Sequence, residues 1–304
     1  MIEPTLNYVT CPGAAVGQSG EQHRMAYWEW NQTGNAAHPH VMLCVHGLTR
    51  QGRDFDVLAQ VLSQHGRVIC PDVVGRGRSD WLAEPLAYGV PQYALDMLAL
   101  LQQLHAAAPI QQLDWLGTSM GGLIGMAVAG NPTLPLPVPV RKLLLNDVGP
   151  VLEWPALQRI AAYVGQAPVF DSLQAGAQAL RALSAGFGPH TDAQWLALSQ
   201  PMLHATEEGR WKLHYDPAIA APMRRMTQEQ SLQSQSVLWQ LYDAIEAQTL
   251  LVRGANSDLV THESADAMGM RGPHARYVEL EGVGHAPTFV ADDQVAIAKD
   301  FFVG

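Results

Sequence analysis

The stretch "DWLGTSMGGLIGM", residues 114–126, places a single serine in a cluster of glycines between two apolar segments. The first segment predicts a strand and the second predicts a helix. Gly117, Ser119 and Gly121 form the pattern G-x-S-x-G, which in this context turns a strand sharply into a helix with the serine at the apex. Only glycine relieves the backbone crowding at such a turn. We therefore predict that Ser119 is a nucleophile, the alternative being a serine that caps the helix.

Other sites that use glycine loops or metal ligands fit the sequence less well. No Lys-Ser or Lys-Thr follows the glycines, which disfavours a phosphate-binding loop. The stretch "GRGRS" at 75–79 lacks the third glycine and the helix of a dinucleotide site. An H-E-x-x-H motif and metal-type Cys/His spacing are also missing from the sequence. We expect no cofactor and no bound metal.

A nucleophilic serine needs a base, normally a histidine that a carboxylate orients. Among twelve histidines, His285 is favoured because it lies in a glycine turn directly after the last predicted strand. Asp147 in "LLLNDVGP" and Asp258 in "LVRGANSDLV" each follow a strand and could be the acid. We favour Asp258, because its strand comes immediately before the strand of the histidine, and keep Asp147 as the alternative. Asp72, in "CPDVVGRGRSD", is expected to brace a turn.

An oxyanion hole needs a second main-chain N–H from a different loop. The segment "CVHGLTRQG" follows an apolar strand, and its Gly47 lets the backbone approach the site. We predict that the main-chain N–H groups of Leu48 and Met120 face the same oxygen, and that His46 has a structural role.

The apolar runs along the chain predict the fold class. They lie at 41–45, 67–70, 113–117, 142–147, 249–254 and 276–280, and such near-continuous runs suit strands buried on both faces of a parallel sheet. Helix-period segments between several of them predict a doubly wound, mostly parallel α/β sheet. "LNYVT" and "RMAYWEW", within the first forty residues, predict an antiparallel pair at one edge, and residues 292–302 predict a closing helix.

The alternation of strand and helix breaks after residue 150. Helical periods follow one another at 154–164, 172–186 and 192–205, which predicts an all-helical insertion at 150–230 and a core at 1–149 and 231–304. Thr191 with Gln194, and Thr227 with Gln230, have the spacing of capping boxes. Some large apolar side chains of the insertion are expected to line an acyl pocket, the candidates being Trp154, Trp195, Trp211, Met202, Met223 and Met226.

Composition and charge narrow the choice of partners. The chain has 304 residues, of which 48% are hydrophobic and 15% charged, so it can bury a large core. A net charge of −10 disfavours nucleic acid or an anionic membrane surface as the main partner, and we expect a small-molecule substrate instead. Cys44 and Cys70 lie inside apolar runs as buried thiols, and the start of the chain predicts no secretory signal. These features favour a cytoplasmic location, while the oligomeric state is not indicated.

Five segments together resemble the α/β-hydrolase-fold enzymes, in the order found in that family: "VHGL" 45–48, "DVVGRGRSD" 72–80, "GTSMGG" 117–122, "RGANSDLV" 253–260 and "GVGHAP" 282–287. The resemblance implies Ser119 as nucleophile, His285 as base and Asp258 as orienting acid, with the insertion as a lid. It also implies main-chain Leu48 and Met120 as oxyanion donors. A serine at 119 differs from the aspartate used by the epoxide hydrolases and haloalkane dehalogenases of the fold.

The expected reaction is cleavage of a carboxylic ester through an acyl-enzyme, on a small to medium apolar acyl substrate. Hydrolysis of a carbon–carbon bond in a diketone-type substrate ranks second, because Ala286 and Pro287 follow His285 where such enzymes often have tryptophan. A cofactor-free perhydrolase or haloperoxidase shares the same triad. A binding protein without turnover is a further alternative from a different class.

Overall fold

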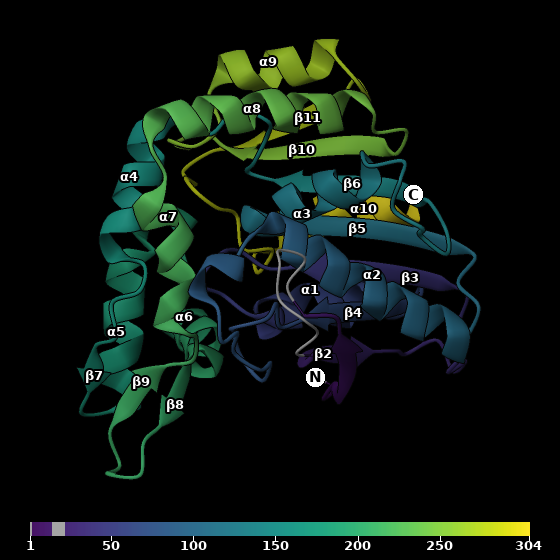
Figure 1. Ribbon diagram of the computed structural model, residues 1–304. Coiled ribbons are helices and arrows are strands. Elements are labelled where there is room, and N and C mark those ends of the chain that lie inside the picture. The colour runs from purple at the N-terminus through teal and green to yellow at the C-terminus, as the bar shows by residue number, and fades with distance from the viewer. Residues whose placement is uncertain (1, 14–21) are drawn as a thin grey trace.

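The computed structural model describes residues 2–13 and 22–304. Within them, eight strands form one sheet in the order β1-β2-β4-β3-β5-β6-β10-β11 (Figure 1). The strands are β1 Thr5–Cys11, β2 His23–Trp30, β3 His40–Val45, β4 Arg67–Pro71, β5 Gln112–Thr118, β6 Val140–Asn146, β10 Gln248–Gly254 and β11 Arg276–Leu280. β1 and β2 are antiparallel, β2 also runs antiparallel to β4, and the remaining pairs are parallel. The predicted sheet and its antiparallel edge are confirmed.

Helices cover both faces of this sheet, which is why its central strands are apolar at nearly every position. All residues of β3 and β4 are buried. One apolar core includes side chains of α2 Val90–Ala107, α3 Met120–Ala129, α8 Gln228–Asp243 and α9 His262–Met270. The other core includes side chains of α1 Asp56–Leu62 and α10 Asp292–Val303. The architecture is therefore a doubly wound α/β fold.

The segment between β6 and α8 lies beyond one end of the sheet (Figure 1). It contains four α-helices, α4 Trp154–Tyr163, α5 Leu173–Leu183, α6 Asp192–Ser199 and α7 Ala221–Arg225. It also contains a small antiparallel sheet of β7 Val169–Phe170, β8 Leu203–Ala205 and β9 Trp211–Leu213. The prediction of an all-helical insertion is therefore wrong, because strands of two or three residues are too short to give an alternating pattern.

The boundaries of the insertion at 150 and 230 stay a prediction. α8 begins at Gln228, inside the predicted insertion, and packs on the core: the main-chain carbonyl of Leu241 lies against Gly130 at the end of α3. Both predicted capping boxes are present, at the starts of α6 and α8. None of the helices in residues 2–13 and 22–304 has the length and apolar character needed to cross a membrane.

Candidate active site

Ser119 lies at a sharp turn between the end of β5 and the start of α3. Its backbone has φ 51° and ψ −115°, a conformation that costs free energy in a residue with a side chain and that is found mainly at functional sites. A Cβ atom on Gly117 would overlap the main chain of Gly121, and one on Gly121 would overlap the carbonyl of Val45. The glycines therefore permit the close approach of three backbone segments, as the sequence predicts.

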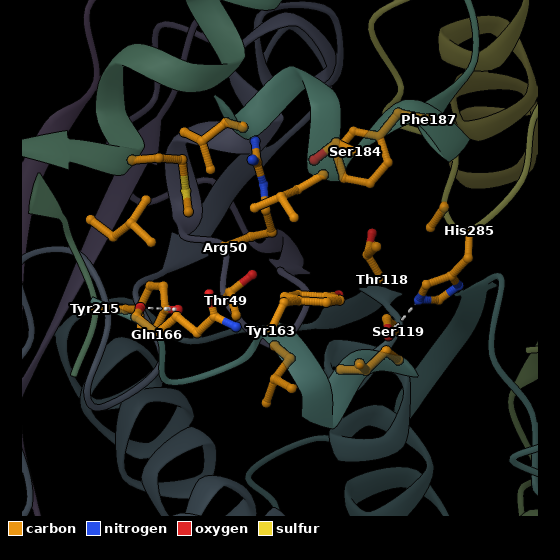
Figure 2. Close-up of a pocket in the computed structure, with 18 of the residues that line it drawn as sticks. Thr49, Arg50, Thr118, Ser119, Tyr163, Gln166, Ser184, Phe187, Tyr215 and His285 are labelled. Atoms are coloured by element: carbon orange, nitrogen blue, oxygen red, sulfur yellow. Dashed lines mark hydrogen bonds between the residues drawn. The ribbon is translucent and has the colours of Figure 1, made fainter. Parts of the chain in front are cut away.

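His285 contacts both Ser119 and a carboxylate. Its Nε2 atom lies 2.9 Å from the hydroxyl oxygen of Ser119 (Figure 2), and its Nδ1 atom lies 2.7 Å from Oδ2 of Asp147. In a neutral imidazole, Nδ1–H donates to the carboxylate and Nε2 accepts the serine proton. This is the arrangement by which a histidine acts as a general base toward a serine.

Asp147 is buried and fixed from several sides. It follows β6 directly, and besides His285 it accepts hydrogen bonds from the N–H of Gly254 at 3.1 Å and the hydroxyl of Ser257 at 2.7 Å. A buried carboxylate is stable as an anion only with such partners. These hydrogen bonds fix the carboxylate of Asp147 next to Nδ1 of His285.

The prediction that Asp258 contacts His285 is wrong. Asp258 is about half exposed, and its two oxygens accept hydrogen bonds of 2.7 and 2.8 Å from Nε and Nη2 of Arg159 on α4. β6 and β10 are neighbouring parallel strands, so the acids that follow them emerge at the same edge of the sheet. Chain order therefore could not decide between the two, and the alternative, Asp147, occupies the expected position.

The predicted oxyanion donors lie on loops that meet beside Ser119. A Cβ atom on Gly47 would lie 3.7 Å from the Cβ atom of Ser119, so the loop that carries Leu48 passes next to the nucleophile. Met120 is the first residue of α3, where an N–H has no partner within the helix. Among the described residues, the N–H groups of Leu48 and Met120 donate to no other group. They are available to an oxyanion, although that role stays a prediction.

A cavity of about 140 Å³ opens onto Ser119 between the core and the insertion. Ser119 and His285 lie at one side of it, and Tyr215 and Gln166 at the other (Figure 2). Its apolar lining includes Leu48, Ile160, Leu180, Leu183, Phe187, Met202 and Leu213. Of the six tryptophans and methionines expected here, only Met202 is among the lining residues. Trp195, for example, stacks against Phe187 at a ring separation of 6.2 Å, so its role is packing.

Residues 40–292 match a family model described as the alpha/beta hydrolase fold. The chain belongs to the α/β hydrolase family. A 3-hydroxybutyrate-oligomer hydrolase of Cupriavidus necator is 48% identical to it over 304 residues, covering 99% of this chain and 98% of the relative. An esterase of Mycobacterium tuberculosis is 28% identical over 256 residues, covering 81% and 76% of the two chains. The crystal structure of an alpha/beta hydrolase from Novosphingobium aromaticivorans has a TM-score of 0.80 and 33% identity, covering 99% and 98%.

His46 supports the loop that carries Leu48 in this α/β hydrolase and makes no contact with Ser119 or Asp147 in the described hydrogen bonds. Its Nε2 accepts a hydrogen bond of 2.9 Å from the N–H of Val73, and its Nδ1 donates to the carbonyl of Gly47 at 2.7 Å. Burial lowers the pKa of His46 to about 3, which keeps the ring neutral. The side chain therefore joins the loop to the turn after β4, in agreement with the predicted structural role.

Asp72 braces that turn, as predicted. It accepts hydrogen bonds from the N–H of Gly52 at 2.8 Å, the N–H of Arg78 at 2.9 Å and the indole of Trp28 at 3.3 Å. Burial raises the pKa of Asp72 to about 6, an effect that these donors oppose.

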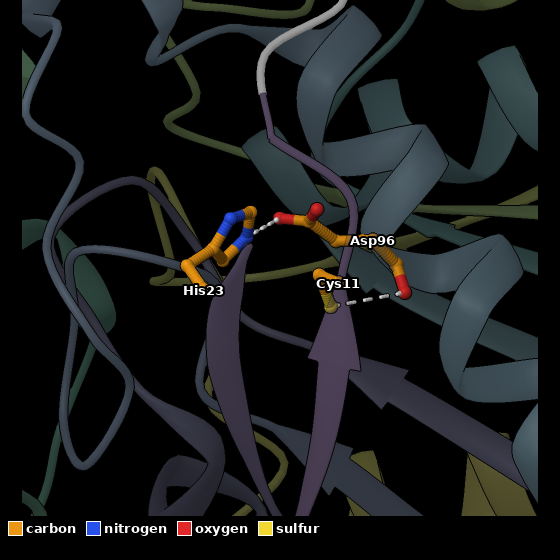
Figure 3. Close-up of side chains that lie close together, drawn as sticks. All are labelled: Cys11, His23 and Asp96. Atoms are coloured by element: carbon orange, nitrogen blue, oxygen red, sulfur yellow. Dashed lines mark hydrogen bonds and ion pairs between the residues drawn. The ribbon is translucent and has the colours of Figure 1, made fainter. Parts of the chain in front are cut away.

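A second cluster of buried polar side chains is formed by Cys11, His23 and Asp96 (Figure 3). Cys11, His23 and Asp96 bring one potential ligand atom each to within 4.8 Å of one another. His23 Nε2 lies 3.1 Å from Asp96 Oδ2, and the thiol of Cys11 lies 3.9 Å from the main-chain oxygen of Asp96. Gln92 donates to the same carboxylate at 2.7 Å. The cluster fastens β1 and β2 to α2, and no short motif in the sequence could have indicated it.

Proposed function

We propose that this α/β hydrolase cleaves carboxylic esters with Ser119 as nucleophile, His285 as base and Asp147 as the orienting acid. The observation that carries this proposal is the hydrogen-bonded chain Ser119–His285–Asp147 at a strained turn. The nearby main-chain N–H groups of Leu48 and Met120 donate to no other group in the part of the chain that the structure describes. Such a constellation is recognised by geometry and roles, and it serves acyl transfer.

The reaction has two steps. His285 Nε2 takes the proton of Ser119 as the hydroxyl oxygen attacks the acyl carbon, and the N–H groups of Leu48 and Met120 hold the oxyanion. The carbon–oxygen bond to the alcohol then breaks, and His285 returns its proton to the leaving alcohol, which produces an ester on Ser119. A water molecule, deprotonated by His285, attacks this ester, releases the acid and restores the serine hydroxyl.

The proposed substrates are short oligomers of 3-hydroxybutyrate, in which esters join four-carbon units. The 48% identity to a 3-hydroxybutyrate-oligomer hydrolase, across nearly the whole of both chains, supports this choice. The cavity supports it too: about 140 Å³ is below the roughly 300 Å³ at which pockets for drug-sized molecules begin. Its lining mixes aliphatic side chains with hydroxyl groups such as those of Thr49, Ser184 and Tyr215, which suits a substrate of methyl groups and polar oxygens.

A substrate panel tests the proposal. Purified protein is assayed on the 3-hydroxybutyrate dimer, on aryl esters of two to sixteen carbons and on a β-diketone. We expect turnover of the dimer and of the shorter aryl esters, with a kcat/KM that falls at least about tenfold for the longest chains, which the cavity cannot enclose. Cleavage of the diketone without cleavage of any ester would overturn the proposal.

A further inference from the structure

We propose that Arg159, held in place by Asp258, binds the free carboxylate at the acid end of the substrate. The inference rests on the proposed hydrolysis of short hydroxy-acid oligomers and adds to it a subsite of defined chemistry. Every such oligomer ends in one carboxylate, so a site that recognises this group distinguishes a short free acid from a neutral ester.

Arg159 offers an unused hydrogen-bonding edge on the wall of the catalytic cavity. It lines the same cavity as Ser119, and its side chain is 48% exposed. Nε and Nη2 donate to the two oxygens of Asp258, and the guanidinium also interacts with the hydroxyl of Tyr163. A guanidinium can bind one carboxylate along its Nε–Nη2 edge and a second along its Nη1–Nη2 edge. No described carboxylate or carbonyl occupies the Nη1–Nη2 edge of Arg159, so an incoming carboxylate can bind there with the Tyr163 hydroxyl beside it.

Asp258 fixes the orientation of the Arg159 guanidinium. An ion pair as exposed as this one contributes little to stability, so its main effect is to hold a flexible side chain in one orientation. The pair also cancels the long-range attraction of Arg159 for anions in general. Recognition would then depend on short, directed hydrogen bonds, which favour a carboxylate that fits the cavity.

The second arginine of the cavity cannot serve the same purpose. Arg50 is only 11% exposed; its Nε and Nη2 bind Asp54 at 2.6 Å, and Nη2 also donates to the carbonyl of Leu198 at 2.9 Å. Nη2 therefore has no N–H left for a second carboxylate, and the side chain joins the loop after β3 to the insertion. Arg159 is therefore the better candidate for binding a substrate anion.

Tyr163 provides a second donor near Arg159. It is one helical turn further along α4, and its ring lies between Tyr215 and Ser119 in the cavity (Figure 2). Burial raises the pKa of Tyr163, an effect opposed by the positive charge of Arg159, so the hydroxyl stays protonated at neutral pH. The two side chains can thus offer three N–H or O–H donors from one face of a single helix.

The test compares two substrates that differ only at the acid end: the 3-hydroxybutyrate dimer and its terminal carboxamide. Both contain the same single ester, and the readout is the ratio of their kcat/KM values. We expect the wild type to prefer the free acid by about ten- to a hundredfold, the range of a charge-assisted bidentate contact. Arg159→Gln should bring the ratio close to one, and Arg159→Lys, which keeps the charge without the fork, should give an intermediate ratio.

Arg181→Gln is the matched control, because Arg181 is an equally exposed arginine of the insertion whose ion pair with Asp192 lies outside the cavity. It should keep the wild-type ratio. A wild-type ratio near one, or an unchanged ratio in Arg159→Gln, would overturn the carboxylate subsite and leave ester hydrolysis intact. Absence of turnover on both substrates would instead contradict the proposed function.

Discussion

Oδ2 of Asp147 lies 2.7 Å from Nδ1 of His285, although 138 positions separate the two residues in the chain. The contact forms because β6 and β11 both pair with β10, so the loops that follow these strands meet at one edge of the sheet. Strand order brings both Asp147 and Asp258 to this edge, and the direction of the side chain makes Asp147 the partner of His285.

Exchange of the two candidate acids for asparagine separates their roles. Asp147→Asn should lower kcat on a neutral aryl ester by about 10⁴, because an amide neither favours the required tautomer of His285 nor stabilises its charge. Asp258→Asn should lower it by at most about tenfold, since Asp258 acts only through Arg159. Steady-state kinetics of both variants measure this directly, and a larger loss in Asp258→Asn than in Asp147→Asn would refute the assignment.

The turn at Ser119 should not tolerate a side chain at its second glycine. Gly121→Ala places a methyl group against the carbonyl of Val45, so we expect a loss of about 2 kcal/mol or more in the free energy of unfolding, together with lower kcat. Gly269→Ala is the control, because a Cβ atom there meets only an ordinary contact and alanine favours the helix. Urea denaturation compares the two, and a fully stable Gly121→Ala would contradict the close approach.

His46 should make stability depend on pH. Burial lowers its pKa to about 3, whereas an unfolded histidine titrates near 6.5, so only the unfolded chain gains a proton between these values. The stability contributed by neutral His46 is therefore complete above pH 6.5 and is lost as the pH falls toward 3. The advantage of the wild type over His46→Gln in urea denaturation should shrink by about 2 kcal/mol from pH 7.5 to pH 5. A difference that does not change with pH would argue against a buried neutral ring.

The Cys11–His23–Asp96 cluster should contribute to the free energy of unfolding and not to kcat. His23→Leu leaves the buried carboxylate of Asp96 without its histidine partner, and removing the hydrogen-bond partner of a buried acceptor costs about 1–3 kcal/mol. We expect this loss in the free energy of unfolding, with kcat per folded molecule as in the wild type. Reduced kcat in fully folded His23→Leu would show that the cluster influences the active site.

Features carried by short, local patterns could be predicted from the sequence. Continuous apolar runs indicate the strands, because side chains on both faces of these strands pack against helices. The spacing of Gly117, Ser119 and Gly121 located the turn, and the glycines around His285 located the candidate base. The capping boxes at Thr191 and Thr227 were equally local.

Features that depend on packing could not be predicted. Asp147 and Asp258 follow two neighbouring strands, and only the packed structure shows which of their side chains points toward His285. The strands of the insertion are too short to show an alternating pattern of apolar residues. The sequence also does not indicate whether the ring of Trp195 lines the cavity or packs against another ring. The Cys11–His23–Asp96 cluster forms only when α2 packs on β1 and β2.

The central claim, that Ser119 attacks the ester, is tested most directly by the turnover of the 3-hydroxybutyrate dimer in Ser119→Ala. Circular dichroism provides the check that the variant is folded. The account predicts a fall in kcat on the order of 10⁶, because no other described group of the site takes the place of the hydroxyl beside His285. Turnover of folded Ser119→Ala within tenfold of the wild type would contradict it.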